Sequence, residues 1–136
     1  MVNIFNLSID HPRFAKKFTN TESHDHEHVL AYNQVEFRES SKSPGVFTAL
    51  TKKASNIAFG KLKFTPKSVK KRTKTGNYVS HFNVVYGTLL LKLENEKVGS
   101  IIKTGFYFHV GEQTNYTLTN LRNDEAMIDF TIIKEN

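Results

Sequence analysis

The sequence predicts an all-β domain, an antiparallel sandwich or barrel, that follows a short N-terminal extension of helical and irregular structure. The chain has 136 residues, of which 38% are hydrophobic and 24% are charged, values that fit one globular domain. After residue 45, short apolar runs recur about every ten residues with turn residues between them, and no helical pattern separates them. We therefore divide the chain into an extension, residues 1–45, and a β domain, residues 46–136.

The extension contains one helix signal and one loop signal. Asp10 followed by Pro12 is typical of a helix start, and apolar side chains then recur on one helical face, which predicts a short helix near 11–19. Residues 28–37 fit either a helix or a strand. Residues 40–45 read SSKSPG and predict a loop that ends the extension.

The β domain is predicted from eight apolar runs, each about the length of a strand. They cover residues 46–50, 57–64, 78–86, 88–93, 98–102, 106–110, 115–119 and 125–133. Side chains alternate between the two faces of a strand, so Ser80, Phe82, Val84 and Tyr86 are expected to share one face.

The last predicted strand is apolar on both faces. Ile128 and Phe130 share one face, whereas Met127 and Ile133 lie on the other with Asp129. A solvated sheet needs only one apolar face, so the second face predicts either a subunit interface or a covering N-terminal segment. His109 also alternates away from its apolar neighbours, and we assign Met127, Ile133 and His109 to a predicted dimer surface.

Composition excludes several classes of function. The chain has no cysteine, which excludes disulfides, a thiol nucleophile and cysteine-ligated metal centres. No apolar run approaches the roughly 20 residues of a membrane-spanning helix. The start of the chain lacks the basic and apolar regions of a secretory signal, so we expect an intracellular protein with no membrane partner.

Positive charge is concentrated in one window. Residues 52–75 contain nine lysine or arginine residues and no acidic residue, in a chain whose net charge is +6. Such a block attracts acidic protein surfaces or nucleic acid, although a solvated loop and strand face is the commoner explanation. The predicted basic surface comprises Lys61, Lys63, Lys67, Lys70, Lys71 and Arg72.

The glycine spacing near the end of the chain resembles a cupin. Gly105, Gly111, Gln113, Tyr116 and Asn120 have the spacing of the second cupin motif, and Gly87 resembles the glycine that closes the first. The resemblance implies a cupin jelly roll, also called a double-stranded β-helix, in which two sheets curl around a central pocket.

Within the cupins, residues 57–132 resemble the C-terminal domain of the centromere protein C (CENP-C) family. The matching segments are GKLKFTP at 60–66, the basic run 67–74, VVYGTLLL at 84–91, YTLTN at 116–120 and Glu125-Ala126 with Phe130. The family's arginine-rich, tryptophan-containing nucleosome-binding motif is absent, because the chain has no tryptophan.

The resemblance implies a homodimerising module that recruits other proteins and catalyses no reaction. Its implied partners are a second copy, centromere or kinetochore proteins and centromeric histone-loading factors, in the nucleus. A weak nucleic acid contact through the basic window would add to these.

A cupin metal site is not expected here. Counting back from Gly87 places Ser80 at the position of the glutamate ligand, with Gly76 and Lys74 near the histidine positions, and Tyr116 replaces the fourth ligand. None of these is an ordinary ligand for a divalent metal.

The separate run HDHEH at 24–28 could bind zinc or nickel if it were extended, but a solvated loop is the commoner reading. We therefore expect no cofactor, no metal and no catalytic residue.

The cupin resemblance also predicts a central pocket, which here would contain no catalytic group. Its predicted lining is Ser80, Phe82, Phe108, Tyr116 and Leu118, with Lys74 at its mouth. It suits a peptide segment or a small ligand, and a filled barrel core is an equal alternative. A second hypothesis is a metal-independent cupin that binds or isomerises a small ligand such as a sugar nucleotide. Tyr116 would then act as an acid and Lys74 would hold the anion.

Overall fold

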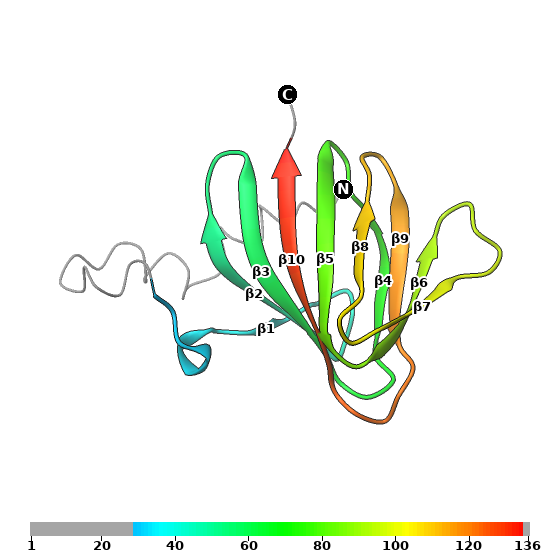
Figure 1. Ribbon diagram of the computed structural model, residues 1–136, viewed down its shortest axis with the longest axis horizontal. Coiled ribbons are helices and arrows are strands. Elements are labelled where there is room, and N and C mark those ends of the chain that lie inside the picture. Colours follow the sequence, from blue (N-terminus) through cyan, green and yellow to red (C-terminus); the bar gives the residue numbers. More distant parts are fainter. Residues whose placement is uncertain (1–28, 135–136) are drawn as a thin grey trace.

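The computed structural model describes residues 29–134, which form ten strands and one short 3-10 helix (Figure 1). The predicted helix near 11–19 and the histidine run at 24–28 lie outside the described residues. In chain order the elements are η2 (Tyr32–Gln34), β1 (Arg38–Glu39), β2 (Val46–Lys53), β3 (Ile57–Phe64), β4 (Val69–Lys74), β5 (Tyr78–Tyr86), β6 (Thr88–Leu93), β7 (Ser100–Lys103), β8 (Tyr107–Val110), β9 (Asn115–Asn120) and β10 (Ala126–Lys134).

The strands form two antiparallel sheets that face each other. The first has the order β1-β2-β3-β10-β5-β8, and the second has the order β4-β9-β6-β7. Figure 1 shows the sheets curving toward each other to enclose the interior. The expected all-β antiparallel architecture is confirmed, and β1 shows that part of the predicted extension joins the larger sheet. The domain boundary at residue 45 stays a prediction.

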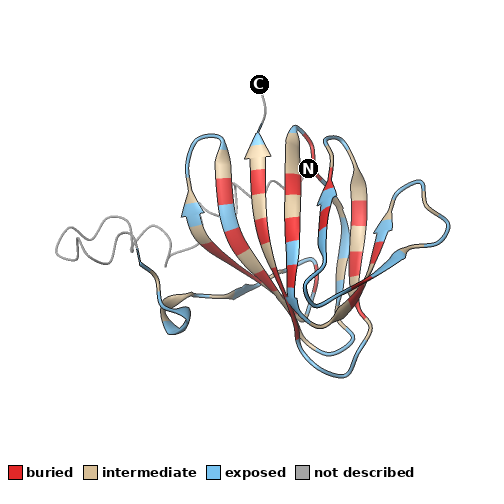
Figure 2. Cartoon of the chain, viewed as in Figure 1, coloured by how far each residue is buried: buried red, intermediate tan, exposed pale blue. Residues whose placement is uncertain are grey.

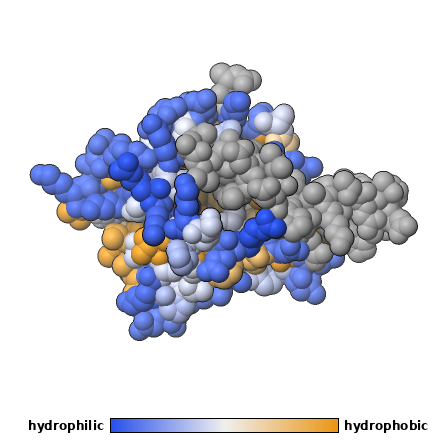
Figure 3. Space-filling view, turned by 180° about the vertical axis from the view of Figure 1, so that it is seen from behind, coloured by the Kyte–Doolittle hydropathy of each residue, from blue (hydrophilic) through white to orange (hydrophobic). Residues whose placement is uncertain are grey.

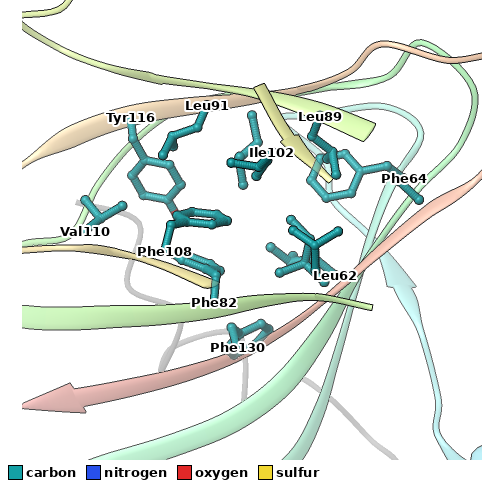
Figure 4. Close-up of a cluster of buried hydrophobic side chains, with 14 of the residues drawn as sticks. Leu62, Phe64, Phe82, Leu89, Leu91, Ile102, Phe108, Val110, Tyr116 and Phe130 are labelled. Carbon is teal, nitrogen blue, oxygen red and sulfur yellow. The ribbon is translucent and has the colours of Figure 1, made fainter. Parts of the chain in front are cut away.

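Alternation along the strands builds the core. In β3 every second residue is buried, from Ala58 to Phe64, and β9 shows the same pattern, as the bands in Figure 2 show. Both sheets turn their buried side chains toward each other, and each large apolar side chain contributes about 1.5–3 kcal/mol when fully buried. Phe82 and Phe108 stack with ring centroids 4.6 Å apart in the middle of this core (Figure 4).

At the corner between β5 and β6, the structure differs from the predicted orientation of Tyr86. A β-bulge interrupts the β5–β10 pairing, so that Tyr86 lies opposite Met127 while Val84 lies opposite Ile128. The extra residue turns Tyr86 away from the core face that Val84 occupies. Tyr86 is therefore 36% exposed, and its hydroxyl donates to the carboxylate of Glu125. The expectation that Tyr86 shares the inner face of Phe82 is wrong for this reason.

Strand β4 is absent from the eight apolar runs because most of its side chains are basic and exposed. It lies at the edge of the four-stranded sheet, where one side is free of a neighbour and charged side chains are well tolerated. An apolar-run search misses such a strand, since little of its surface faces the core.

Asn120 joins two loops, between β3 and β4 and between β9 and β10, at one end of the two sheets. The side chain is fully buried, and its Nδ2 donates to the carbonyls of Thr65, 3.0 Å, and Asp124, 2.8 Å. Its Oδ1 accepts from the backbone N–H of Arg122 at 3.1 Å. These bonds satisfy backbone groups that would otherwise be buried without partners, and they close this end of the fold.

Candidate binding cavity and surfaces

A cavity of about 600 Å³ opens between the two sheets on the side of β2 and β4. These strands belong to different sheets and are not neighbours in either, so the interior is open between them. The apolar part of the wall comes from alternating residues of the larger sheet together with Tyr78 and Tyr116. The lining residues include Val46, Thr48, Leu50, Leu62, Tyr78, Ser80, Tyr116 and Ile132.

The mouth of the cavity is strongly basic. Arg38 and Lys42 lie on one side, and four cations of β4 lie on the other: Lys70, Lys71, Arg72 and Lys74. In the part of the chain that the structure describes, Glu39 is the one acidic residue that lines the cavity, and its carboxylate accepts from the backbone N–H of Gly45 at 2.9 Å. A mouth with this excess of positive charge attracts anionic groups.

Lys70 is the cation that points into the cavity. Its Nζ donates to Thr73 Oγ1 at 2.7 Å and lies 5.2 Å from the ring centroid of Tyr116. Burial, and then the nearby Lys42 ammonium, lower the pKa of Lys70 from 10.5 to about 8. The ammonium group of Lys70 is thus partly desolvated and lies near a like charge.

Tyr116 forms the inner wall beside Lys70. The residue is 6% exposed, and burial raises the pKa of its hydroxyl above the ordinary value of 10.0. The phenol is therefore neutral at physiological pH. Its ring supplies an apolar surface and a π face for the Lys70 ammonium.

The structure divides the predicted pocket residues into two groups. Ser80, Tyr116 and Lys74 line the cavity, with Lys74 exposed at the mouth. Phe82, Phe108 and Leu118 instead belong to the packed core, where they are 2%, 9% and 0% exposed. The rings of Phe82 and Phe108 lie between the sheets in Figure 4, beside that of Tyr116. Sequence reasoning did not find Lys70 as a lining residue, because β4 carries no apolar alternation that would reveal its inner face.

The positions that align with cupin metal ligands do not form a ligand set. Ser80 and Gly76 are buried, Lys74 is exposed, and Tyr116 carries a neutral phenol. Within residues 29–134, no three histidine, aspartate or glutamate side chains gather in a way that could hold a metal ion.

The outer face of the six-stranded sheet carries an aromatic cluster, defined by His81, Tyr107 and His109. The rings of His81 and Tyr107 are stacked 5.9 Å apart, and His81 Nδ1 forms a 2.6 Å hydrogen bond with the hydroxyl of Tyr107. His109 lies 5.9 Å from His81 and 6.1 Å from Tyr107. Tyr107 is 52% exposed, and Phe59, on the same face with two strands between them, is 39% exposed.

The other predicted interface residues lie on this face but differ in exposure. Ile133 is partly exposed, whereas Met127 is only 3% exposed within the single chain. Met127 lies opposite Lys63 of β3, and the Lys63 ammonium lies 4.3 Å from the ring centroid of Phe37. The segment before β1 therefore reaches the outer face beside Met127. A covering N-terminal segment was one of the two alternatives that the sequence predicted for this face.

The six predicted basic residues do not form one surface. On the outer face Lys61 pairs with Asp129 at 2.7 Å, and Lys63 lies against aromatic rings. Lys67 donates to the carbonyl of Leu121 at the closed end. Only Lys70, Lys71 and Arg72 lie together, at the cavity mouth.

A second exposed apolar area lies on the four-stranded sheet, at β6 and β7. Figure 3 shows hydrophobic surface on the side that carries β6 and β7. Ile101 of β7 and Val98 just before it are 55% and 82% exposed.

No helix in residues 29–134 has the length and apolarity needed to cross a bilayer.

Two antiparallel sheets rolled around a cavity that opens between their edges define a cupin domain. Solved structures support this class. The cupin domain of Schizosaccharomyces pombe Cnp3 superposes with a TM-score of 0.70 at 13% identity, over 79% of this chain and 74% of that one. A predicted oxalate decarboxylase from Thermotoga maritima gives 0.71 at 16% identity, over 79% and 99%. The Drosophila melanogaster CENP-C structure described as bound to CAL1 gives 0.62 at 18% identity, over 74% and 82%.

The family is fixed by the sequence itself. Residues 46–132 match the family model described as Mif2/CENP-C like, and the chain belongs to that family. The expected resemblance to CENP-C is thereby confirmed. The comparison with curated proteins gave no match.

Proposed function

We propose that this domain forms a homodimer and recruits partner proteins at centromeric chromatin in the nucleus, without catalysing a reaction. Its family membership supports the centromeric setting, and the structure of a relative bound to CAL1 supports protein recruitment. Dimerisation would bring two copies of any attached chromatin-binding segment together and so raise avidity without new contacts.

The observation that carries the dimer is the exposed aromatic face of the larger sheet. Tyr107, Phe59 and Val85 are 52%, 39% and 40% exposed on this sheet, and His81 and His109 lie beside Tyr107. Exposed aromatic side chains gathered on one sheet face are typical of the centre of a protein interface. Tyr107 lies on β8, at the edge of this sheet, where a second copy could approach without moving the core.

The absence of catalysis is supported by the donor groups that line the cavity. Tyr116 stays protonated far above neutral pH, so it is a poor proton donor. Lys74 is exposed at the mouth, where it could attract an anion but is not enclosed with a reacting group. Among residues 29–134, no carboxylate or histidine lines the deep part of the cavity to act as a second acid or base.

Sedimentation equilibrium of the full chain tests the dimer and its face. Tyr107→Arg places a charge at the centre of the aromatic cluster and is expected to weaken dimerisation at least tenfold. Ile101→Arg is the matched control, because it places the same charge on the exposed apolar area of β7. Loss of the dimer in Ile101→Arg but not in Tyr107→Arg would move the interface to the smaller sheet. A wild-type monomer at micromolar concentration would refute dimerisation.

A further inference from the structure

The open side of the cavity combines features that together specify a ligand. Its wall is apolar, its mouth is cationic, and strand edges from two sheets border it. We propose that this side of the cavity binds an extended acidic peptide from a partner protein, with its apolar side chains inside and its carboxylates against the β4 cations. The inference rests on the proposed recruitment function and names the chemistry of the recruited segment.

Charge is the first argument. Of the described residues that line the cavity, six are lysine or arginine and one is acidic, and this residue, Glu39, already accepts from Gly45 N–H. Acidic residues elsewhere in the described chain do not neutralise Lys70, whose nearest influential charge is the cation of Lys42. A partner carboxylate would relieve this repulsion and form charge-assisted hydrogen bonds.

The partly buried position of Lys70 is the second argument. Its ammonium group has one hydroxyl acceptor, Thr73, and the face of the Tyr116 ring. A partly desolvated ammonium without an anion is disfavoured, because loss of solvent destabilises the charged form. A carboxylate that enters the cavity would offset that cost, so binding and charge neutralisation occur at the same atom.

Free strand edges are the third argument, and they favour a peptide over a small anion. β4 has a neighbouring strand on one side only, and on its other side the backbone N–H of Lys71 donates to Ser43 Oγ at 2.9 Å. The rest of this edge, toward Lys74, can accept an added strand, a common way in which sheets bind extended peptides. Alternating side chains of such a strand would point in turn toward the apolar wall and toward the solvent side of the mouth.

The size of the cavity fits this ligand. A volume of about 600 Å³ lies within the range of sites that enclose a ligand or several side chains. Leu50, Leu62 and Ile132 provide apolar contact surface, while Thr48 and Ser80 provide hydroxyl groups. The site therefore has both the apolar area that gives affinity and the polar groups that fix register.

Fluorescence anisotropy with a labelled octapeptide of alternating glutamate and leucine tests the proposal on the full chain. A peptide with lysine in place of glutamate is the charge control and is expected not to bind. Lys70→Met and, separately, Arg72→Glu at the exposed mouth are each expected to weaken binding at least tenfold. Lys92→Met removes the same charge from an exposed site on β6 and is expected to change binding less than twofold.

Several outcomes would overturn the proposal. Equal loss in Lys92→Met would show that net charge alone attracts the peptide. Unchanged binding in both Lys70→Met and Arg72→Glu would place the peptide elsewhere. A labelled DNA duplex that binds more tightly than the peptide, and is lost in the same variants, would assign the mouth to nucleic acid. Sedimentation of the same samples separates these results from dimerisation, since a chain that dimerises but binds no peptide refutes only this inference.

Discussion

The interior of the domain has two regions built from the same alternating strands but packed differently. Around Phe82 and Phe108, stacked rings fill the space between the sheets. Between β2 and β4 the strands are not paired, the apolar wall is interrupted by small polar residues such as Thr48 and Ser80, and an open cavity remains. Inward alternation therefore defines which side chains face the interior, whereas side-chain size and the absence of pairing between strand edges decide whether that interior is filled.

The largest expected effect lies in the filled region. Phe82→Ala should lower the free energy of unfolding by about 3–5 kcal/mol, because it removes a ring that is 2% exposed and stacks on Phe108. Leu50→Ala, on the cavity wall, should cost only about 2 kcal/mol, since one side of Leu50 already faces open space. Urea unfolding measures both, and equal losses would contradict the contrast between the two regions.

Asn120 tests whether the closed end depends on hydrogen bonds as well as on packing. Asn120→Ala should cost about 2–4 kcal/mol, because the carbonyls of Thr65 and Asp124 lose their donor in a buried place. Thermal and urea unfolding measure the loss. A loss below 1 kcal/mol would mean that water replaces the side chain at this end.

Lys70 should give the open region a distinctive pH dependence. Its native pKa of about 8 lies below the ordinary value of 10.5, so the unfolded chain binds more protons between these pH values. Stability contributed by this group therefore rises as pH increases from about 8 to 10.5, by about 1–3 kcal/mol, and is flat below 8. The comparison is between wild type and Lys70→Met by urea unfolding at pH 7.5 and 10. A pH response that is the same in both proteins would show that Lys70 is solvated.

The smallest expected effect is a change in the cavity wall. Thr48→Val keeps the shape of the side chain but removes its hydroxyl, and it should change stability by about 1 kcal/mol. It should nevertheless alter affinity for the alternating glutamate and leucine peptide, because the hydroxyl faces the cavity. If stability falls as much as in Phe82→Ala, the wall around Thr48 is as tightly packed as the core.

Sequence reasoning predicted the fold well where side chains alternate cleanly. The runs that became β3 and β9 show buried residues at every second position, and periodicity detects such strands directly. It missed β4, whose charged side chains carry no apolar pattern. It placed Tyr86 on the wrong face, because a bulge depends on the partner strand and leaves no mark in the local sequence.

The candidate site was only partly predictable, for a related reason. Alternation correctly turned Ser80 and Tyr116 inward, yet it could not tell which inward residues line open space. Phe82 and Phe108 fill their own region because they stack on each other across β5 and β8, a pairing that requires knowledge of the sheet order. The sequence assigned Lys70 to a basic surface, and only the structure shows that it lines the cavity, beside the ring of Tyr116.

The position of β10 between β3 and β5 governs how the chain folds during synthesis. Lys61 of β3 and Asp129 of β10 pair across 68 residues of sequence. β3 therefore emerges from the ribosome long before β10, and this side of β3 has no partner strand until β10 has been made. Such distant pairings slow folding and leave strand edges open to misassembly. A polypeptide truncated before residue 126 would lack β10 and therefore the middle of the larger sheet.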